Sequence, residues 1–191
     1  KNKMKKFWHN LMKKDKYYYA YDYLINRGLT DEIITEFRLG YCDYNYAKAK
    51  KGDKNYPYKK FTNRIVFPIF DEYSKIVGFS GRKLPDSDDK YPKYINSAEE
   101  DIPFFKKKET IYNLHRAKKF IRKKDQVIWV EGFMDVIFLY KYGIKNVVAS
   151  MGTAVTKEQV KKMQKYTNNI ILYLDPDSSG QKAMKRSLKI F

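Results

Sequence analysis

Three acidic residues, Glu131, Asp175 and Asp177, stand where short apolar stretches give way to polar loops. The apolar stretches 127–131 and 170–174 are predicted strands, and a helical pattern follows each of them. Strands that alternate with helices form a parallel sheet, and such sheets bind ligands beyond the carboxyl ends of their strands. Clustered carboxylates repel one another unless a cation lies among them, and oxygen ligands suit hard cations. The pattern therefore predicts a Mg²⁺ or Mn²⁺ site for phosphate chemistry.

The acids are more informative together than singly. Asp135 lies in the first turn of the helix that follows Glu131, where an acid most often stabilises the helix dipole. An Asp-x-Asp loop such as 175–177 often makes only a turn. A Glu after the first strand and an Asp-x-Asp-x-x-Gly loop after the third, however, share one edge of the predicted sheet. We interpret Glu131, Asp175 and Asp177 as candidate metal ligands.

The elements that position these acids form a β-α-β-α-β-α run over residues 124–191, with 147–149 as the middle strand. Residues 156–159 and 178–181 both match the capping box, so we expect helices to begin there. Residues 1–123 are predicted to form a basic subdomain of helices and a hairpin. Its expected elements are helices over 5–26, 30–37 and 113–123, strands over 64–70 and 75–84, an extended stretch over 91–97 and a polar loop over 42–63.

Composition and charge restrict the class of protein. The chain of 191 residues carries 40 Lys and Arg against 22 Asp and Glu, a formal net charge of +18. This charge favours nucleic acid over membrane as a partner, although AT-rich coding is an alternative source of the excess Lys. A single cysteine, Cys42, excludes an intramolecular disulfide and a zinc finger. The charged run 122–125 is the predicted boundary between the parts 1–123 and 124–191.

Motifs along most of the chain resemble those of bacterial-type DNA primases, the DnaG family, and they follow the family order. In the second part the resemblance is to the Toprim domain and rests on residues 131–135, 149–153 and 175–180. In the first part it rests on residues 23–30, 63–69, 78–82, 92–97 and 111–114. The resemblance implies an α/β fold, in which a basic α+β helix-and-hairpin subdomain precedes a Toprim-type parallel sheet.

The resemblance also implies roles for individual residues. The acids of the metal site correspond to Glu131, Asp175 and Asp177, with Asp135 in support. The groove that the family uses for template and nucleoside triphosphates corresponds to Arg82, Lys93, Tyr94, Asn96 and Lys107. We expect Tyr94 to stack on a base. Ser150, Gly152 and Thr153 follow the middle strand, and two interpretations of this loop stay open. The residues either contact a phosphate or only form the turn.

Three features depart from the family pattern. Pro176 stands where the family usually has Gly, which stiffens the loop and removes one backbone donor. Lys108 replaces the Gly that usually follows the residue at 107. The family carries further acids downstream, whereas this chain stops at Phe191, and its ends are expected to be cuts through a longer protein.

The implied function is template-directed synthesis of short RNA primers on single-stranded DNA, from nucleoside triphosphates and with Mg²⁺ or Mn²⁺. The expected partner of the full-length protein is the replicative helicase. The expected location is the cytoplasm at the nucleoid, with a DNA-containing organelle of a eukaryote as the alternative.

Two other functions stay open, namely a topoisomerase or nuclease piece and a non-catalytic Toprim DNA-binding module. Residues 64–97 argue against the first. The single cysteine and the retained acids argue against the second.

Overall fold

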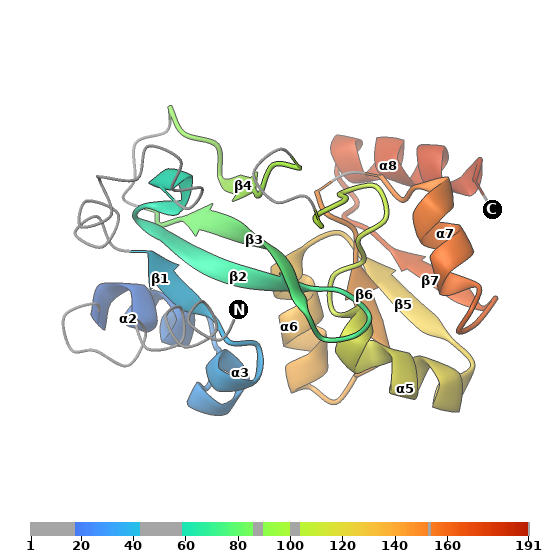
Figure 1. Cartoon of the computed structure of the whole chain (residues 1–191), viewed down its shortest axis with the longest axis horizontal. Helices are drawn as coiled ribbons and strands as arrows, with labels where there is room; N and C mark the ends of the chain where they lie inside the picture. Colours follow the sequence, from blue (N-terminus) through green and yellow to red (C-terminus); the bar gives the residue numbers. More distant parts are fainter. Residues whose placement is uncertain (1–17, 43–58, 86–89, 100–103, 153, 191) are drawn as a thin grey trace. The chain divides into compact units, whose positions relative to one another are not determined.

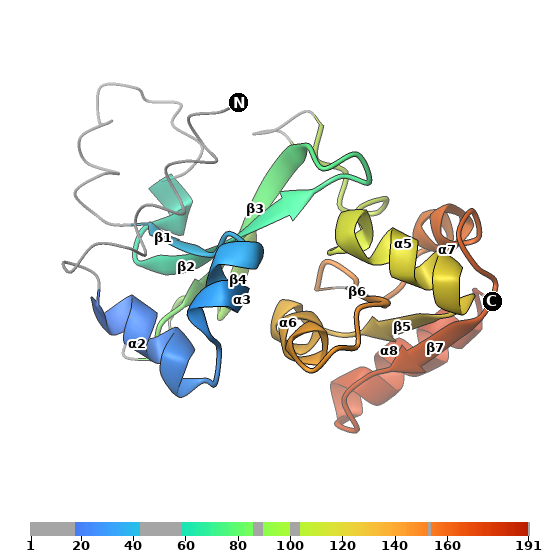
Figure 2. The same ribbon diagram turned by 90° about the horizontal axis from the view of Figure 1, so that it is seen from below.

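The structure is a computed structural model that describes residues 18–42, 59–85, 90–99, 104–152 and 154–190, shown from two directions in Figures 1 and 2. By its internal contacts the chain divides into two compact units. The first contains the described residues of Lys1–Ile69 and Gly78–Ile102, and the second contains those of Phe70–Val77 and Pro103–Phe191. The predicted boundary between residues 123 and 124 stays a prediction about folding and protease sensitivity.

The first unit is built on a four-stranded sheet with the strand order β1-β2-β3-β4. The outer pairs are antiparallel, and their register sets Arg82 directly opposite Tyr94. Residues in that relation have side chains on the same face of a sheet. The elements of the first half of the chain are α2 Tyr18–Asn26, α3 Asp31–Glu36, β1 Gly40–Cys42, η2 Lys59–Phe61, β2 Arg64–Phe70, β3 Ile76–Lys83 and β4 Tyr94–Asn96.

The second unit contains a parallel three-stranded sheet with the order β6-β5-β7. Its elements are α5 Leu114–Lys124, β5 Val127–Val130, α6 Phe133–Lys141, β6 Val147–Ala149, α7 Lys157–Met163, β7 Ile170–Tyr173 and α8 Ser178–Leu188. The chain leaves β5 toward β6 and then returns past β5 to reach β7. The order therefore reverses between β5 and β7, which is where open α/β sheets bind their ligands.

The core of the second unit lies on one face of this sheet, under α5 and α7 (Figure 2). Trp129 of β5 is fully buried there, together with Ile121 of α5 and Met163 of α7. Four apolar residues of α6, among them Val136 and Ile137, are buried outside this cluster. No helix in the described part of the chain is both long enough and apolar enough to span a bilayer.

The predicted parallel strands, the hairpin and the helices over 30–37 and 113–123 are confirmed. Of the extended stretch expected over 91–97, Tyr94–Asn96 form the strand β4. The helix expected over 5–26 is described only from Tyr18, and most of the loop expected over 42–63 lies outside the described residues.

Two expectations need correction. Residues 40–42 form a strand, β1, that the sequence did not indicate, because all three are buried and show no alternation. The capping box expected at 178–181 is wrong, because Asp177 caps α8 by accepting a hydrogen bond from Gly180 N at 2.7 Å.

Candidate functional site

The carboxyl ends of β5 and β7 bring two of the predicted acids together. These strands pair in parallel, with Val130 opposite Tyr173, so the residues that follow them lie at the same edge of the sheet. Glu131 is half-buried, and its Oε2 accepts a hydrogen bond from Asp175 N at 3.3 Å. The Asp175 carboxylate is exposed and makes no hydrogen bond with the described residues. The switch point between β5 and β7 therefore carries an exposed carboxylate beside a second, anchored one.

The other two predicted acids lie at helix amino termini. Asp177 is the N-cap of α8. Asp135 lies in the first turn of α6, and its Oδ2 accepts a hydrogen bond from Gly132 N at 2.9 Å. Each carboxylate thus satisfies a backbone donor at a helix start and complements the helix dipole. A carboxylate has about four lone-pair sites in all, so a cap leaves acceptor capacity for a cation.

Gly180 lets the start of α8 come close to the backbone of Asp175. A Cβ built at Gly180 would overlap the Asp175 carbonyl oxygen and would lie 2.9 Å from the carbonyl carbon. The final Gly of the Asp-x-Asp-x-x-Gly pattern is therefore required by this approach. Pro176 lies between the two acids, and its carbonyl accepts a hydrogen bond from Gln181 Nε2 at 3.1 Å.

The donor set at this edge suits a hard divalent cation. Glu131, Asp175 and Asp177 offer only carboxylate oxygens, the ligands of Mg²⁺ and Mn²⁺. Among the described residues, no three His, Cys, Asp or Glu side chains are gathered closely enough to hold a metal ion. The ligand type therefore fits a divalent metal ion, although the side chains of the described residues, as they lie in this structure, do not form a closed coordination site.

In the first unit, Arg82 and Tyr94 form a hydrogen-bonded pair. Arg82 Nη1 donates to Tyr94 Oη at 2.7 Å, and the guanidinium lies 5.2 Å from the Tyr94 ring centre and 5.7 Å from that of Tyr23. Burial alone would lower the pKa of Arg82, but the hydrogen bond to Tyr94 and the nearby Tyr23 outweigh it, so the net pKa is raised. For Tyr94 burial acts in the opposite direction and raises the pKa. The hydrogen bond and charge of Arg82 lower it by less, so the net pKa of Tyr94 is raised.

Within this pair, the Arg82 Nε–H is buried without a hydrogen-bond partner among the described residues. Tyr94 is half-buried, and its ring lies 6.2 Å from that of Phe67. The pair is therefore held in place on the sheet.

Arg64 holds the backbone next to Lys93 in place, a role that the sequence did not indicate. Its buried guanidinium donates from Nη1 to the carbonyl of Pro92 at 2.9 Å and to that of Gly81 at 3.3 Å. Lys93 itself is exposed, and Asn96 is half-buried on β4. The sequence offered one signal, a charged residue at the start of an apolar strand.

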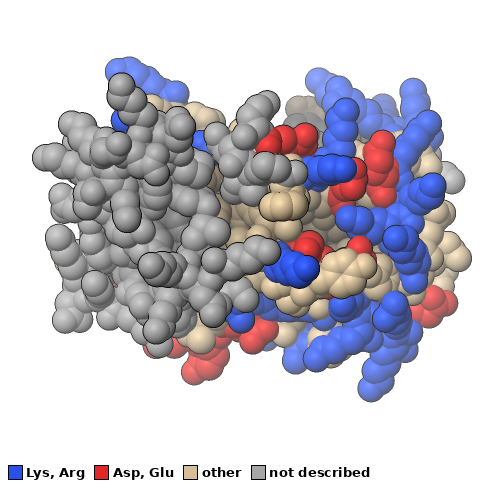
Figure 3. All heavy atoms as spheres, in the orientation of Figure 1, with Lys and Arg blue, Asp and Glu red and all other residues tan. Residues whose placement is uncertain are grey.

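The remaining predicted contacts belong to the second unit. Lys107 is half-buried, in a turn that contacts α7. Ser150 is buried and Gly152 is exposed with a φ of +73°, whereas Thr153 lies outside the described residues. Figure 3 shows Lys and Arg side chains spread widely over the visible face of this unit, with Asp and Glu among them. Charge alone therefore does not define a binding track.

The parallel sheet with Glu131 after β5 and an Asp-x-Asp loop after β7 defines the second unit as a Toprim-type domain. A family model described as Toprim-like matches residues 128–191. A second, described as DNA primase catalytic core, N-terminal domain, matches residues 44–118. The chain belongs to the family of bacterial DnaG-type DNA primases. Proteins of this family depend on a divalent metal ion, and the family assignment does not identify which metal.

Individual proteins agree with this assignment. A DNA primase of Lactococcus lactis is 40% identical over 189 residues, which cover 90% of this chain and 29% of the relative. The structure of the zinc-binding and RNA polymerase domains of Aquifex aeolicus primase matches with a TM-score of 0.86 and 32% identity, over 99% of this chain and 50% of that one. A DnaG primase catalytic domain bound to single-stranded DNA matches with a TM-score of 0.85 and 29% identity, over 99% of this chain and 64% of that one.

The chain thus spans about a third or less of the length of curated relatives such as the Lactococcus lactis primase.

Proposed function

We propose that this chain is part of the RNA polymerase core of a DNA primase, which makes short RNA primers on single-stranded DNA from nucleoside triphosphates. The observation that carries the proposal is the pair of acids Glu131 and Asp175, held side by side at the switch point of a Toprim-type sheet. The similar catalytic domain solved with single-stranded DNA supports the nature of the template.

The acids of the second unit would hold Mg²⁺ or Mn²⁺. When bound, the metal would lower the pKa of the attacking 3′-hydroxyl and neutralise phosphate oxygens. Asp175 offers an exposed carboxylate, and Asp177 is oriented by its bond to Gly180 N. Glu131 serves either as a further ligand or as the acceptor of the hydroxyl proton. Asp135 supports the site from the start of α6.

Basic side chains would bind the phosphates of template and nucleotide. Arg82 provides a planar, partly desolvated guanidinium, and a planar guanidinium suits two-point contact with a phosphate. Lys93 and Lys107 act as point charges, and Tyr94 presents a ring for stacking. Asn96 and the loop residues Ser150, Gly152 and Thr153 complete the proposed contacts. In the full-length protein we expect the replicative helicase as a partner, in the cytoplasm at the nucleoid or in a DNA-containing organelle.

Dinucleotide synthesis on a single-stranded DNA template tests this function. Synthesis by the full-length protein should require both a divalent metal and template, and Asp175→Asn should abolish it. Asp71→Asn is the matched control, because the Asp71 side chain accepts hydrogen bonds from Tyr73 N and Lys75 N in a hairpin turn, which Asn can also do. Metal-dependent cleavage or relaxation of DNA instead would identify another Toprim enzyme, and DNA binding without any reaction would identify a non-catalytic module.

A further inference from the structure

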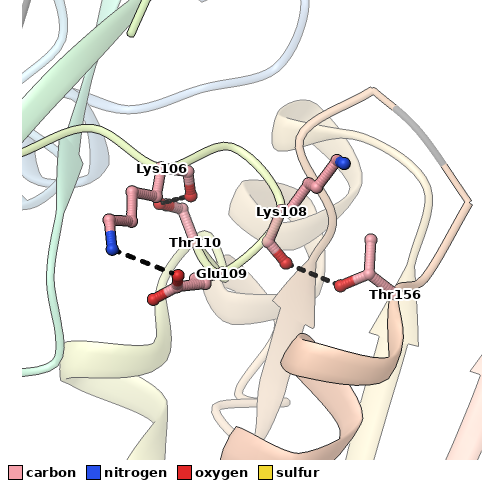
Figure 4. Close-up of polar contacts among 5 residues, drawn as sticks. All are labelled: Lys106, Lys108, Glu109, Thr110 and Thr156. Carbon is pink, nitrogen blue, oxygen red and sulfur yellow. Dashed lines mark hydrogen bonds and ion pairs between the residues drawn. The ribbon is translucent and has the colours of Figure 1, made fainter.

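A turn with three consecutive lysines, 106–108, is fastened to the first turn of α7 (Figure 4). Thr156 Oγ1 donates to the carbonyl of Lys108 at 2.6 Å. Gln159 Nε2 donates to the carbonyl of Thr110 at 2.7 Å. Both donors are side chains at the start of α7, and both acceptors are backbone carbonyl oxygens of the turn. The helix therefore fixes the backbone of the turn and not only the conformation of one side chain.

The turn is also closed by its own hydrogen bonds. The Lys106 carbonyl accepts from Thr110 Oγ1 at 2.7 Å, from Thr110 N at 2.9 Å and from Glu109 N at 3.0 Å. Lys106 Nζ lies 3.4 Å from Glu109 Oε1. Lys108 is not among the described residues with positive φ, so a side chain is tolerated where the family usually has Gly. The lysine turn is therefore a compact unit with two ties to α7.

The ties reuse a capping box. Gln159 N donates to Thr156 Oγ1 at 3.1 Å, and Thr156 N donates to Gln159 Oε1 at 3.1 Å. A Glu would serve this box as well as a Gln, but only the amide has a proton for the Thr110 carbonyl. Gln159 is fully buried, so an unmatched amide there would be costly. The Gln159 amide therefore makes two hydrogen bonds, one that caps α7 through Oε1 and one that holds the turn through Nε2.

We infer that Thr156 and Gln159 are positioning residues that fix the lysine turn so that Lys107 meets a nucleotide phosphate. The inference rests on the proposed phosphate contact of Lys107. Holding Lys107 against a phosphate requires both its side chain and the backbone beneath it to be ordered, and ordering each of them costs free energy. Fixing the backbone beneath Lys107 lowers that cost without touching the ligand.

Substitutions that delete the ties and leave the start of the helix largely intact test the inference. Thr156→Asp keeps an acceptor for Gln159 N, removes the donor to the Lys108 carbonyl and adds a charge. Thr156→Gly adds no charge and removes both the donor and that acceptor, although Gly is itself a favoured N-cap residue. Gln159→Glu keeps the acceptor for Thr156 N and removes the donor to Thr110. Thr156→Ser keeps both functions of the hydroxyl. Gln164→Glu is the control for added charge, because Gln164 is exposed at the other end of α7.

Two measurements are made on the full-length protein. The first is the rate of trypsin cleavage after residues 106–108, read by mass spectrometry. It should rise roughly fivefold, the factor for removal of one hydrogen bond, in Thr156→Asp and Thr156→Gly. It should rise by at least as much in Gln159→Glu, whose buried carboxylate would face the Thr110 carbonyl oxygen, and stay near wild type in Thr156→Ser and Gln164→Glu. The second is the affinity for ATP in the presence of Mg²⁺, which should fall in the same three variants by a similar factor, and at least as much in Lys107→Ala.

The outcomes are distinguishable. If Thr156→Asp and Thr156→Gly match Thr156→Ser in both measurements, the inference is overturned. If cleavage rises as expected but Lys107→Ala leaves ATP affinity unchanged, the ties are confirmed and the phosphate role of Lys107 is refuted. If ATP affinity falls in Lys107→Ala but in none of the tie variants, Lys107 binds phosphate without help from α7, and the positioning role is refuted.

Discussion

Replacing Gly180 by Ala should displace the loop that carries Asp175 while leaving the rest of the second unit folded. The new Cβ would overlap the Asp175 carbonyl oxygen and lie 2.9 Å from its carbon and 3.2 Å from Asp175 N. These are backbone atoms, so no rotation of a side chain relieves the overlap. Either the loop or the first turn of α8 must move.

The magnitude follows from opposing effects. Overpacking of this kind costs about 1–3 kcal/mol. Moving the helix start also weakens the cap between Asp177 Oδ1 and Gly180 N, which are 2.7 Å apart, and loss of such a cap costs about 1 kcal/mol. Ala is favoured over Gly inside a helix by about 1 kcal/mol, which offsets part of this. We expect Gly180→Ala to lower the free energy of unfolding by about 2 kcal/mol.

Denaturant unfolding and Mn²⁺ calorimetry check both consequences, loss of stability and loss of metal affinity. Gly143→Ala is the control, because Gly143 has a φ of +88° and nothing within 4 Å of a new Cβ. It should cost about 1–2 kcal/mol through backbone strain and leave Mn²⁺ affinity unchanged. A Gly180→Ala protein with native stability and native Mn²⁺ affinity would refute the close approach of α8 to Asp175.

Three further predictions concern charge, domain organisation and pH. Removing one cation that binds a phosphate should lower the slope of log affinity against log salt for single-stranded DNA by about 0.7. Replacing Arg82, Lys93 and Lys107 together by Ala should therefore flatten the salt dependence strongly. The same replacement of Lys1, Lys3 and Lys5, in the terminal segment outside the described residues, should flatten it far less. Equal effects of the two triple changes would mean diffuse binding by the net charge. Limited trypsin digestion should cut first within 122–125 or 42–63, and early cutting within 127–175 would show that the domains are misplaced. Burial and then the hydrogen bond to Glu72 raise the pKa of Tyr166 from 10.0 to about 12, so its contribution to stability is full below pH 10 and is lost as pH rises toward 12. Alkaline unfolding of Tyr166→Phe should lack that loss, and an unchanged pH profile would contradict the assignment.

The second unit could be predicted because each of its signals is local. Apolar strands with acids directly after them fixed the place of Glu131 and Asp175, and the capping box at Thr156 marked the start of α7. The parallel order then followed from the alternation of strands and helices. Residues close in sequence were enough for these assignments.

The cap of α8 shows where local patterns compete. Asp177 and Ser178 are both good caps, and the sequence favoured Ser178 through its Gln three residues on. In the structure Asp177 has the extended backbone of an N-cap and holds Gly180 N. The capping motifs alone do not decide between the two residues. With Asp177 as the cap, α8 begins at Ser178 and Gly180 lies against the backbone of Asp175.

The packing of the hairpin tip was not predictable for a different reason. Residues 70–77 belong to the second unit, where Tyr166 donates to Glu72 Oε2 and Lys118 Nζ donates to the Glu72 carbonyl. These partners are 94 and 46 residues away in the sequence. An exposed-looking turn gives no sign of such distant contacts. The buried Arg64 was missed on similar grounds, since its acceptors are backbone carbonyls of other segments.

The affinity for Mn²⁺, measured by calorimetry on wild type and on the Asp175→Asn, Asp177→Asn double variant, tests most directly whether the edge acids hold a metal ion. Asn can still cap α8 at position 177, so loss of the helix would not explain a change. Asp71→Asn is the control for removal of a charge elsewhere in the second unit. We predict that the double variant loses most of its Mn²⁺ affinity while the control keeps it. An unchanged affinity in the double variant would contradict the metal site.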